Sequence, residues 1–294
     1  MPLPEVSVIC IFLDGERFIA EAIDSVLRQQ DVAFELLLVD DGSTDGSTAI
    51  AQGYAERFPD KVRYLEHPGH VNRGMSATRN LGIRAAQADA IAFIDCDDVW
   101  RPRKLAEQQA ILTQYPAVGM VCGTVNYWSS WEGGSDRLIP TGPVLDAVSP
   151  PPATSLALYP LGTASAPCPS DVLVRKSVIG AVGGFEEQYT GARHMYEDQP
   201  FFGKVYLATG VYFSSQVWLD YRIHDESCVA SVRRDGRYGE VRRFFLDWFA
   251  AYLASHDIAD KAVVERAIRR AQWKLDHPLV ARIARKLGSI ISRA

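Results

Sequence analysis

The sequence predicts an α/β fold in which a doubly wound, mostly parallel sheet is flanked by helices, with a C-terminal helical extension. Short apolar runs alternate with amphipathic stretches at the spacing of βαβ units over roughly the first 120 residues. From Gly236 onward the pattern is helical. With 294 residues, 47% of them hydrophobic, the chain can bury a substantial core.

The elements follow in order from the hydrophobic pattern. Buried apolar runs predict strands, and apolar positions three and four residues apart predict helices. The expected strands are Val6–Phe12, Glu35–Val39, Val62–Leu65, Ala90–Ile94, Val118–Asn126, Val172–Arg175 and Val211–Tyr221. The expected helices are Glu16–Gln30, Ser47–Phe58, Met75–Gln87, Pro102–Tyr115, Gln199–Ala208, Tyr238–Ser255, Lys261–Leu275 and Leu279–Ile291.

The stretch between Tyr127 and Ser170 interrupts this alternation. Gly, Pro and Ser are frequent in it, including the run Ser149–Pro152, and the periodic pattern disappears. A segment of this length inside a compact domain is typically a lid or a binding loop. We therefore expect a flexible loop over residues 127–170.

One apolar run ends in three carboxylates within four residues, Asp95, Asp97 and Asp98. Like charges this close repel one another unless a cation neutralises them, and oxygen ligands suit Mg²⁺ or Mn²⁺. At the carboxyl edge of an open α/β sheet they would lie where such folds bind ligands. The alternative is a solvated acidic turn that caps the helix expected from Pro102.

A second predicted strand ends in the same way, with Asp40 and Asp41 followed by the segment Gly42–Asp45. Glycine and small hydroxylated residues favour a tight turn and a capped helix start. Backbone N–H groups at such a turn could hold a nucleotide phosphate. An ordinary β-turn-α connection is the alternative interpretation.

Composition and charge disfavour several classes of protein. The net charge is −5, and the five cysteines are widely spaced without a CxxC pair, so we expect reduced thiols and a cytoplasmic location. We find no membrane-span pattern and no signal-peptide pattern. The sequence also lacks a GxGxxG after any predicted strand and a GxxxxGK[ST], which disfavours dehydrogenases and P-loop enzymes. An acidic chain predicts no nucleic-acid partner.

Basic residues gather toward the C-terminus. From Asp260 to Ala294, nine Lys or Arg stand against three acids, and apolar residues recur at helical spacing over Leu279–Ile291. A basic amphipathic helix of this kind favours peripheral contact with the inner face of an anionic membrane. The alternative is a helix that packs on its own domain and keeps its basic face in water.

Seven segments, in this order, resemble the motifs of family 2 glycosyltransferases of the GT-A fold. They are VSVICIFLDGERFIAEAIDSVLRQQ, VDDGSTD, SATRNLGIRAA, FIDCDDVW, GGFEEQY, YEDQPFF and YRIHDES, and they span roughly Pro4 to Ser227. The resemblance implies an inverting enzyme that moves a sugar from a nucleoside-diphosphate sugar, a UDP-sugar as the first expectation, to a glycan or lipid-linked acceptor in polysaccharide biosynthesis.

The resemblance also implies a domain organisation and a nucleotide site. Residues 1–230 would form the GT-A domain, with a nucleotide-binding half over 1–126 and an acceptor-binding half over 127–230, and residues 231–294 a helical region. Asp41 would contact the base, with the backbone around Ile11 and with Asp14 forming the rest of that pocket. Arg79 and Asp95 would face the nucleotide, Asp95 toward the ribose.

The reactive centre is implied by three further positions. Asp97 matches the second acid of the DxD motif and would hold Mn²⁺ or Mg²⁺, with His224 near the metal or diphosphate. Asp198, the second acid of its pair, matches the general base that deprotonates the acceptor hydroxyl.

The chain departs from the family pattern in the expected base pocket. Ile11, Leu13 and Asp14 stand where the family usually has Pro, Tyr and Asn. Two other functions stay open: a nucleotide-sugar-binding or scaffold module without turnover, and a sugar nucleotidyltransferase. The second normally has a glycine-rich basic loop after its first strand, which Leu13–Glu16 is not.

Overall fold

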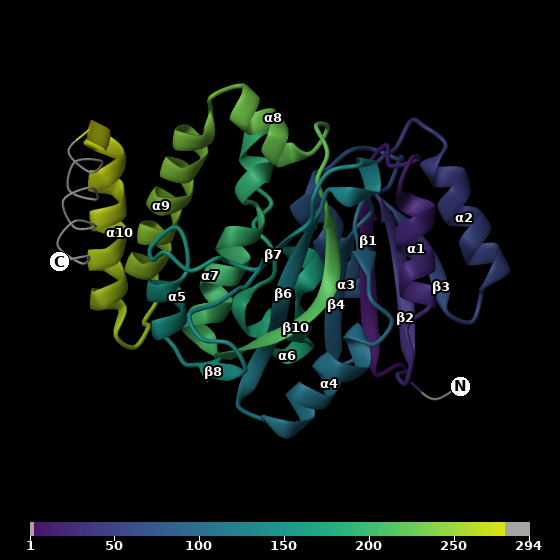
Figure 1. The fold of residues 1–294 in the computed structure, drawn as a ribbon, viewed down its shortest axis with the longest axis horizontal. Coiled ribbons are helices and arrows are strands. Elements are labelled where there is room, and N and C mark those ends of the chain that lie inside the picture. Colours follow the sequence, from purple (N-terminus) through teal and green to yellow (C-terminus); the bar gives the residue numbers. More distant parts are fainter. Residues whose placement is uncertain (1–2, 280–294) are drawn as a thin grey trace.

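The computed structural model describes residues 3–279, which form one mixed sheet between layers of helices (Figure 1). The strands follow the spatial order β3-β2-β1-β4-β9-β6-β10-β5, with β7 added to β6 and β8 to β10. Their bounds are β1 Val6–Phe12, β2 Phe34–Asp40, β3 Val62–Glu66, β4 Ala90–Asp95, β5 Val99–Trp100, β6 Val118–Trp128, β7 Arg137–Ile139, β8 Ala147–Ser149, β9 Leu173–Arg175 and β10 Gly210–Arg222.

The helices cover both faces of the sheet and one end of the molecule. They are α1 Ile19–Leu27, α2 Ser47–Arg57, α3 Met75–Ala85, α4 Lys104–Gln114, α5 Ala153–Ala157, α6 Lys176–Val182, α7 Asp198–Ala208, α8 Cys228–Arg234, α9 Tyr238–Ser255 and α10 Lys261–Asp276. Short 3₁₀ turns lie at η1 Ser130–Glu132, η2 Pro169–Asp171 and η3 Gly191–Tyr196. The α/β class with a mostly parallel sheet is therefore confirmed.

Strand directions decide where the site lies. β1 runs parallel to β2 and β4, and β6 runs parallel to β10. The short β9 is antiparallel to both β4 and β6, so these two strands point the same way. The carboxyl ends of β1, β2, β4, β6 and β10 consequently meet at one edge of the sheet, where open α/β folds bind their ligands.

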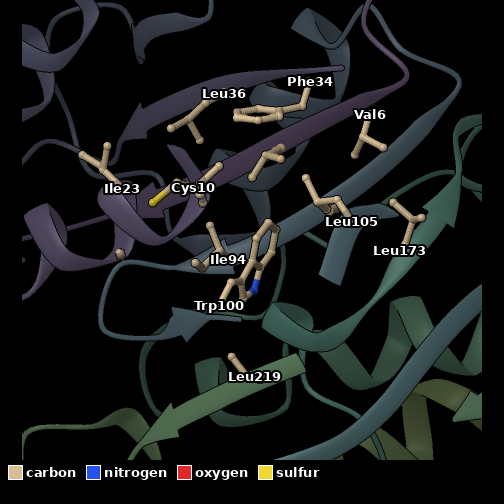
Figure 2. Packing of buried hydrophobic residues seen from close by; sticks show 14 of the residues in the cluster. Val6, Cys10, Ile23, Phe34, Leu36, Ile94, Trp100, Leu105, Leu173 and Leu219 are labelled. Carbon is tan, nitrogen blue, oxygen red and sulfur yellow. The ribbon is translucent and has the colours of Figure 1, made fainter. Parts of the chain in front are cut away.

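Two apolar cores lie on opposite faces of the sheet because side chains alternate along each strand. On one face, strand residues such as Val8 and Cys10 pack with Ile23 of α1 and Leu105 of α4. Figure 2 shows the Trp100 indole among these side chains. On the other face, Ile9 packs with residues of α6 and α7. The two covered faces hold the acid-bearing strand ends in a fixed relation.

A third core joins the C-terminal helices to the rest of the molecule. α9 and α10 lie side by side at one end (Figure 1), and Phe249 of α9 and Ile268 of α10 are buried in this cluster with Tyr196. The basic α10 thus packs on its own domain through its apolar side. The expected helix Leu279–Ile291 lies beyond the described residues, except for Leu279.

The segment over residues 127–170 contains more regular structure than its sequence predicts. β6 continues to Trp128, β7 pairs with β6, β8 pairs with β10, and α5 follows. The expectation of a structureless stretch is wrong because runs of three residues gain their backbone hydrogen bonds by joining an existing sheet, which leaves no periodic pattern to detect. The flexibility of this segment stays a prediction.

Other differences are small in extent. β5, α6 and α8 were not expected, and each has seven residues or fewer, so their periodicity is weak. All five cysteines are free thiols, as expected. None of the helices within residues 3–279 combines the length and apolar character that a bilayer span requires.

Candidate active site at the carboxyl edge of the sheet

Acidic side chains from two distant parts of the chain meet through one buried arginine. Arg79, on the first turns of α3, is 1% exposed. Its Nη2 atom lies 2.5 Å from Oδ1 of Asp95 at the end of β4, and its Nη1 atom pairs with Glu197. Glu197 is itself 3% exposed and accepts a hydrogen bond from Ser76 Oγ at 3.4 Å. The guanidinium therefore joins the acidic turn after β4 to the residue that precedes α7.

Asp198 is the first residue of α7 and follows directly on this anchored glutamate. Burial raises the pKa of Asp198 to about 6, and the Arg79 guanidinium opposes the shift. Burial likewise raises the pKa of Glu197. A carboxylate with a pKa near neutrality, held on a helix end beside a sheet edge, is suited to accept a proton.

Asp97 lies two residues beyond Asp95 and faces a histidine from the far end of the chain. Oδ2 of Asp97 is 2.9 Å from Nε2 of His224, which follows β10. The Asp97 side chain is partly exposed, whereas most of His224 is buried. The two predicted metal-site residues are therefore brought together.

A carboxylate and an imidazole are both ligands for Mn²⁺, and the carboxylate also suits Mg²⁺. Within residues 3–279 no group of three or more His, Cys, Asp or Glu side chains is arranged to hold a metal ion by itself. Divalent ions at phosphate-transfer sites commonly take one or two protein ligands and let substrate phosphates complete the shell. The Asp97–His224 pair fits an ion of that kind.

Asp98, the third acid of the triplet, is directed elsewhere. It is 1% exposed, and its Oδ1 atom accepts a hydrogen bond from the backbone N–H of Arg222 at 3.0 Å. Burial raises the pKa of Asp98 well above its usual range, and the Asp97 and Asp95 carboxylates add to the rise. Asp98 therefore links the acidic turn to β10 and is not available to a ligand.

The residues expected to form the base pocket lie along the β1 and β2 ends. Asp14 has a φ of 51°, and its Oδ1 atom accepts hydrogen bonds from Thr44 N at 2.6 Å and Asp45 N at 3.3 Å. Asp41 is buried, and its Oδ1 atom accepts from the backbone N–H groups of Arg73 and Gly74 at 2.7 and 3.1 Å. Both carboxylates therefore hold the loops at this edge of the sheet through hydrogen bonds to backbone N–H groups.

Two expected nucleotide contacts are buried within the fold. The Ile11 side chain packs in the core on one sheet face, which leaves only its backbone near the edge. Arg79 is almost fully buried, with both terminal nitrogens engaged by Asp95 and Glu197. Their contacts with a nucleotide stay predictions.

Sequence reasoning did not identify two residues that the geometry brings into the site. Glu197 was visible only as the neighbour of Asp198, and Arg222 only as part of the YRIHDES segment. Their partners are far away in the sequence. Glu197 pairs with Arg79, 118 residues away, and Arg222 Nε donates to the carbonyl oxygen of Asp97, 125 residues away. No local pattern could have shown these pairs.

The parallel strands and the acids gathered at their carboxyl edge define an α/β protein of the GT-A class. Residues 7–183, more than half of the chain, match the family model described as glycosyl transferase family 2, and the chain belongs to this family.

Relatives known by sequence are glycosyltransferases by name. The putative glycosyltransferase EpsE of Bacillus subtilis is 34% identical over 140 residues, which cover 48% of this chain and 50% of EpsE. The putative teichuronic acid biosynthesis glycosyltransferase TuaG of the same species is 37% identical over 107 residues, or 36% of this chain and 40% of TuaG. The chain thus spans half or less of the length of these relatives.

Solved structures agree on the fold. S. aureus TarS 1-349 in complex with UDP-GlcNAc has a TM-score of 0.66 at 18% identity, covering 92% of this chain and 71% of TarS 1-349. The mannosyltransferase PcManGT from Pyrobaculum calidifontis, in complex with GDP-Man and Mn²⁺, has a TM-score of 0.63 at 19% identity, covering 97% of this chain and 76% of PcManGT. The GT-A fold is confirmed by these likenesses.

Proposed function

We propose that this chain transfers a sugar from a nucleoside-diphosphate sugar to a hydroxyl of a glycan or lipid-linked acceptor, with inversion at the anomeric carbon and a divalent ion. The observation that carries the proposal is the buried Arg79, which holds Asp95 and Glu197 and thereby brings the DxD turn beside Asp198. The sequence relatives named for polysaccharide synthesis support the acceptor class.

Each chemical requirement of the reaction has a residue in this proposal. Asp198 accepts the proton of the acceptor hydroxyl, a role typically worth about 10²–10⁴-fold in rate. Asp97 and His224 hold the ion, and Asp95 faces the ribose. A bound Mn²⁺ or Mg²⁺ supplies a Lewis acid that stabilises charge on the departing diphosphate. Inversion follows from attack on the face opposite the leaving group, as the family resemblance implies.

The donor class draws on the neighbouring structures. One is a complex with UDP-GlcNAc and the other with GDP-Man and Mn²⁺. We propose a UDP-sugar as the first donor to test, because the neighbouring TarS structure is a complex with UDP-GlcNAc. A module that binds the donor without turnover is the competing outcome.

The proposal is tested by release of nucleoside diphosphate from UDP-, GDP- and dTDP-sugars with Mn²⁺. We expect slow hydrolysis of one donor by the wild-type chain. Asp97→Ala should lower this rate at least about tenfold, because the substitution removes the negatively charged carboxylate that is proposed to hold the metal ion. Mn²⁺ binding should weaken in the same variant.

Asp60→Ala is the control for this experiment, since Asp60 is an exposed acid in the turn before β3. Donor-induced thermal stabilisation without any release of nucleoside diphosphate would favour the binding module. Equal hydrolysis by the Asp97→Ala variant and the wild-type chain, or equal activity in EDTA, would contradict metal dependence.

The pH dependence of the reaction gives a separate test of the base. The proposed base must be deprotonated to accept a proton, so activity should fall as pH decreases through the pKa of Asp198, which is about 6. We expect kcat/KM to rise about tenfold per pH unit below that value and to level off above it. A profile that is flat between pH 5 and about 7.5 would contradict this assignment.

Cytoplasmic location and peripheral membrane contact remain proposals from the sequence. The contact was expected from Leu279–Ile291, which lies almost entirely outside the described residues. Within them, the preceding helix α10 uses its apolar side to pack on α9. The packing of α10 therefore does not test the membrane contact expected from Leu279–Ile291.

A further inference from the structure

Arg222, the last residue of β10, makes three directed contacts around the acidic turn. Its backbone N–H donates to Oδ1 of Asp98 at 3.0 Å, and its Nε donates to the carbonyl oxygen of Asp97 at 2.7 Å. Its Nη2 atom donates to Oε2 of Glu21 on α1 at 2.6 Å. One residue therefore ties the Asp97–Asp98 peptide to β10 and to α1.

Aromatic rings enclose the same guanidinium. Its Cζ atom lies 4.4 Å from the ring centroid of Trp128, 4.8 Å from that of Trp131 and 4.9 Å from that of Phe18. Arg222 as a whole is 4% exposed. Cations over aromatic faces are attracted by the ring quadrupole, more strongly when water is excluded. The charge is thus held in place from several sides.

The position of Arg222 relates it to the Asp97–His224 pair. His224 is two residues further along the chain, and the Phe18 ring that Arg222 contacts is 5.2 Å from the His224 ring. The indole N–H of Trp131 donates to the carbonyl oxygen of Ile223 at 3.1 Å. The backbone next to Asp97 and the backbone next to His224 are therefore both held by Arg222 and the aromatic rings around it.

We propose that Arg222 is a positioning residue that sets the geometry of the Asp97 carboxylate relative to His224. This inference rests on the proposed function. The Nε–H donated to the Asp97 carbonyl fixes the orientation of that peptide, and the Asp98 contact fixes the next residue. Without the guanidinium, the acidic turn has fewer constraints, and Asp97 and His224 adopt their mutual geometry less often.

If Arg222 had only a structural role as an ion-pair partner, its effect would depend on Glu21 alone. The Glu21 side chain is about half exposed, so its pairing with Arg222 contributes little by itself. The positioning role instead depends on the planar, multidentate geometry of the guanidinium, which a lysine ammonium does not reproduce. Lysine and glutamine substitutions therefore separate the two interpretations.

The experiment compares Arg222→Lys, Arg222→Met and Glu21→Gln in the full chain. Mn²⁺ binding is followed by electron paramagnetic resonance with Mn²⁺ alone, and donor hydrolysis gives kcat and KM. We expect Arg222→Met to weaken Mn²⁺ binding about 10–100-fold, as for loss of groups that orient metal ligands. Arg222→Lys should show most of this loss, and Glu21→Gln less than about threefold.

Arg101→Gln is the matched control, because Arg101 forms an ion pair with Asp220 at 2.9 Å near the same strand but is far more exposed. Chemical rescue adds a second readout: guanidinium ion should restore Mn²⁺ binding to Arg222→Ala and not to Asp97→Ala. If Arg222→Met does not fold, Arg222→Lys, which keeps the charge and most of the side-chain length, carries the test.

Three outcomes are decisive. Mn²⁺ binding by Arg222→Lys within twofold of the wild-type chain would overturn the positioning role. A loss of Mn²⁺ binding in Glu21→Gln equal to that in Arg222→Met would mean that Arg222 acts only through its ion pair with Glu21. A wild-type chain that binds Mn²⁺ but releases no nucleoside diphosphate from any donor would contradict the proposed function, while the Mn²⁺ titrations would still decide the role of Arg222.

Discussion

Replacing Asp198 by asparagine is expected to lower kcat for sugar transfer about 10²–10⁴-fold, the usual contribution of a general base. The amide keeps the size and helix-start position of the side chain but cannot take up the acceptor proton. KM for the donor should change little, because donor binding is assigned to other residues. The measurement is steady-state transfer at saturating donor and acceptor.

Asp247→Asn provides the control for this substitution. Asp247 lies on α9 and accepts a hydrogen bond from Gln272 at 2.8 Å, away from the sheet edge. Its kcat should match that of the wild-type chain. An Asp198→Asn variant that retains more than about a tenth of wild-type kcat would show that another group accepts the proton.

Replacing Arg79 by methionine is expected to reduce the free energy of unfolding by about 3–5 kcal/mol. The methionine fills much of the same volume but leaves Asp95 and Glu197 without the cation that they face. Uncompensated charge in a buried site costs far more than the loss of an exposed ion pair. Urea unfolding, followed by tryptophan fluorescence, measures the change.

A double substitution sharpens this prediction. Adding Glu197→Gln to Arg79→Met removes one of the stranded charges, so the double variant should lose less stability than the sum of the single variants. Arg103→Met is the exposed comparison, since Arg103 is 59% exposed and pairs with Glu107 at 3.1 Å, and should cost under about 1 kcal/mol. A similar small loss in Arg79→Met would mean that the arginine does not hold the site together.

The strands and long helices were predictable because their patterns are local. β1 and α9 occur with the expected bounds, Val6–Phe12 and Tyr238–Ser255, since β1 is a continuous apolar run and α9 repeats apolar residues at helical spacing. β7, β8 and β5 were not, because two or three residues carry no period. These short strands are ordered by the sheet that they join.

The sequence indicated which residues belong to the candidate site better than it indicated which of their side chains contact one another. The motifs named Asp97, His224 and Asp198, and the structure brings Asp97 and His224 within hydrogen-bond distance. Arg79 was expected to face a nucleotide but is buried between two carboxylates. A motif identifies which residue types the chemistry needs, whereas the direction of each side chain depends on the packing around it.

By itself, the sequence determined the alternation of strands and helices and the acidic ends of two strands, because apolar periodicity and turn chemistry act over neighbouring residues. Only the tertiary structure decided what each acid of the triplet faces. Asp95 meets Arg79, Asp97 meets His224 and Asp98 meets Arg222, although the three acids lie within four residues. The last two partners are 127 and 124 residues away, so their selection required the folded sheet to bring β4 and β10 to the same edge.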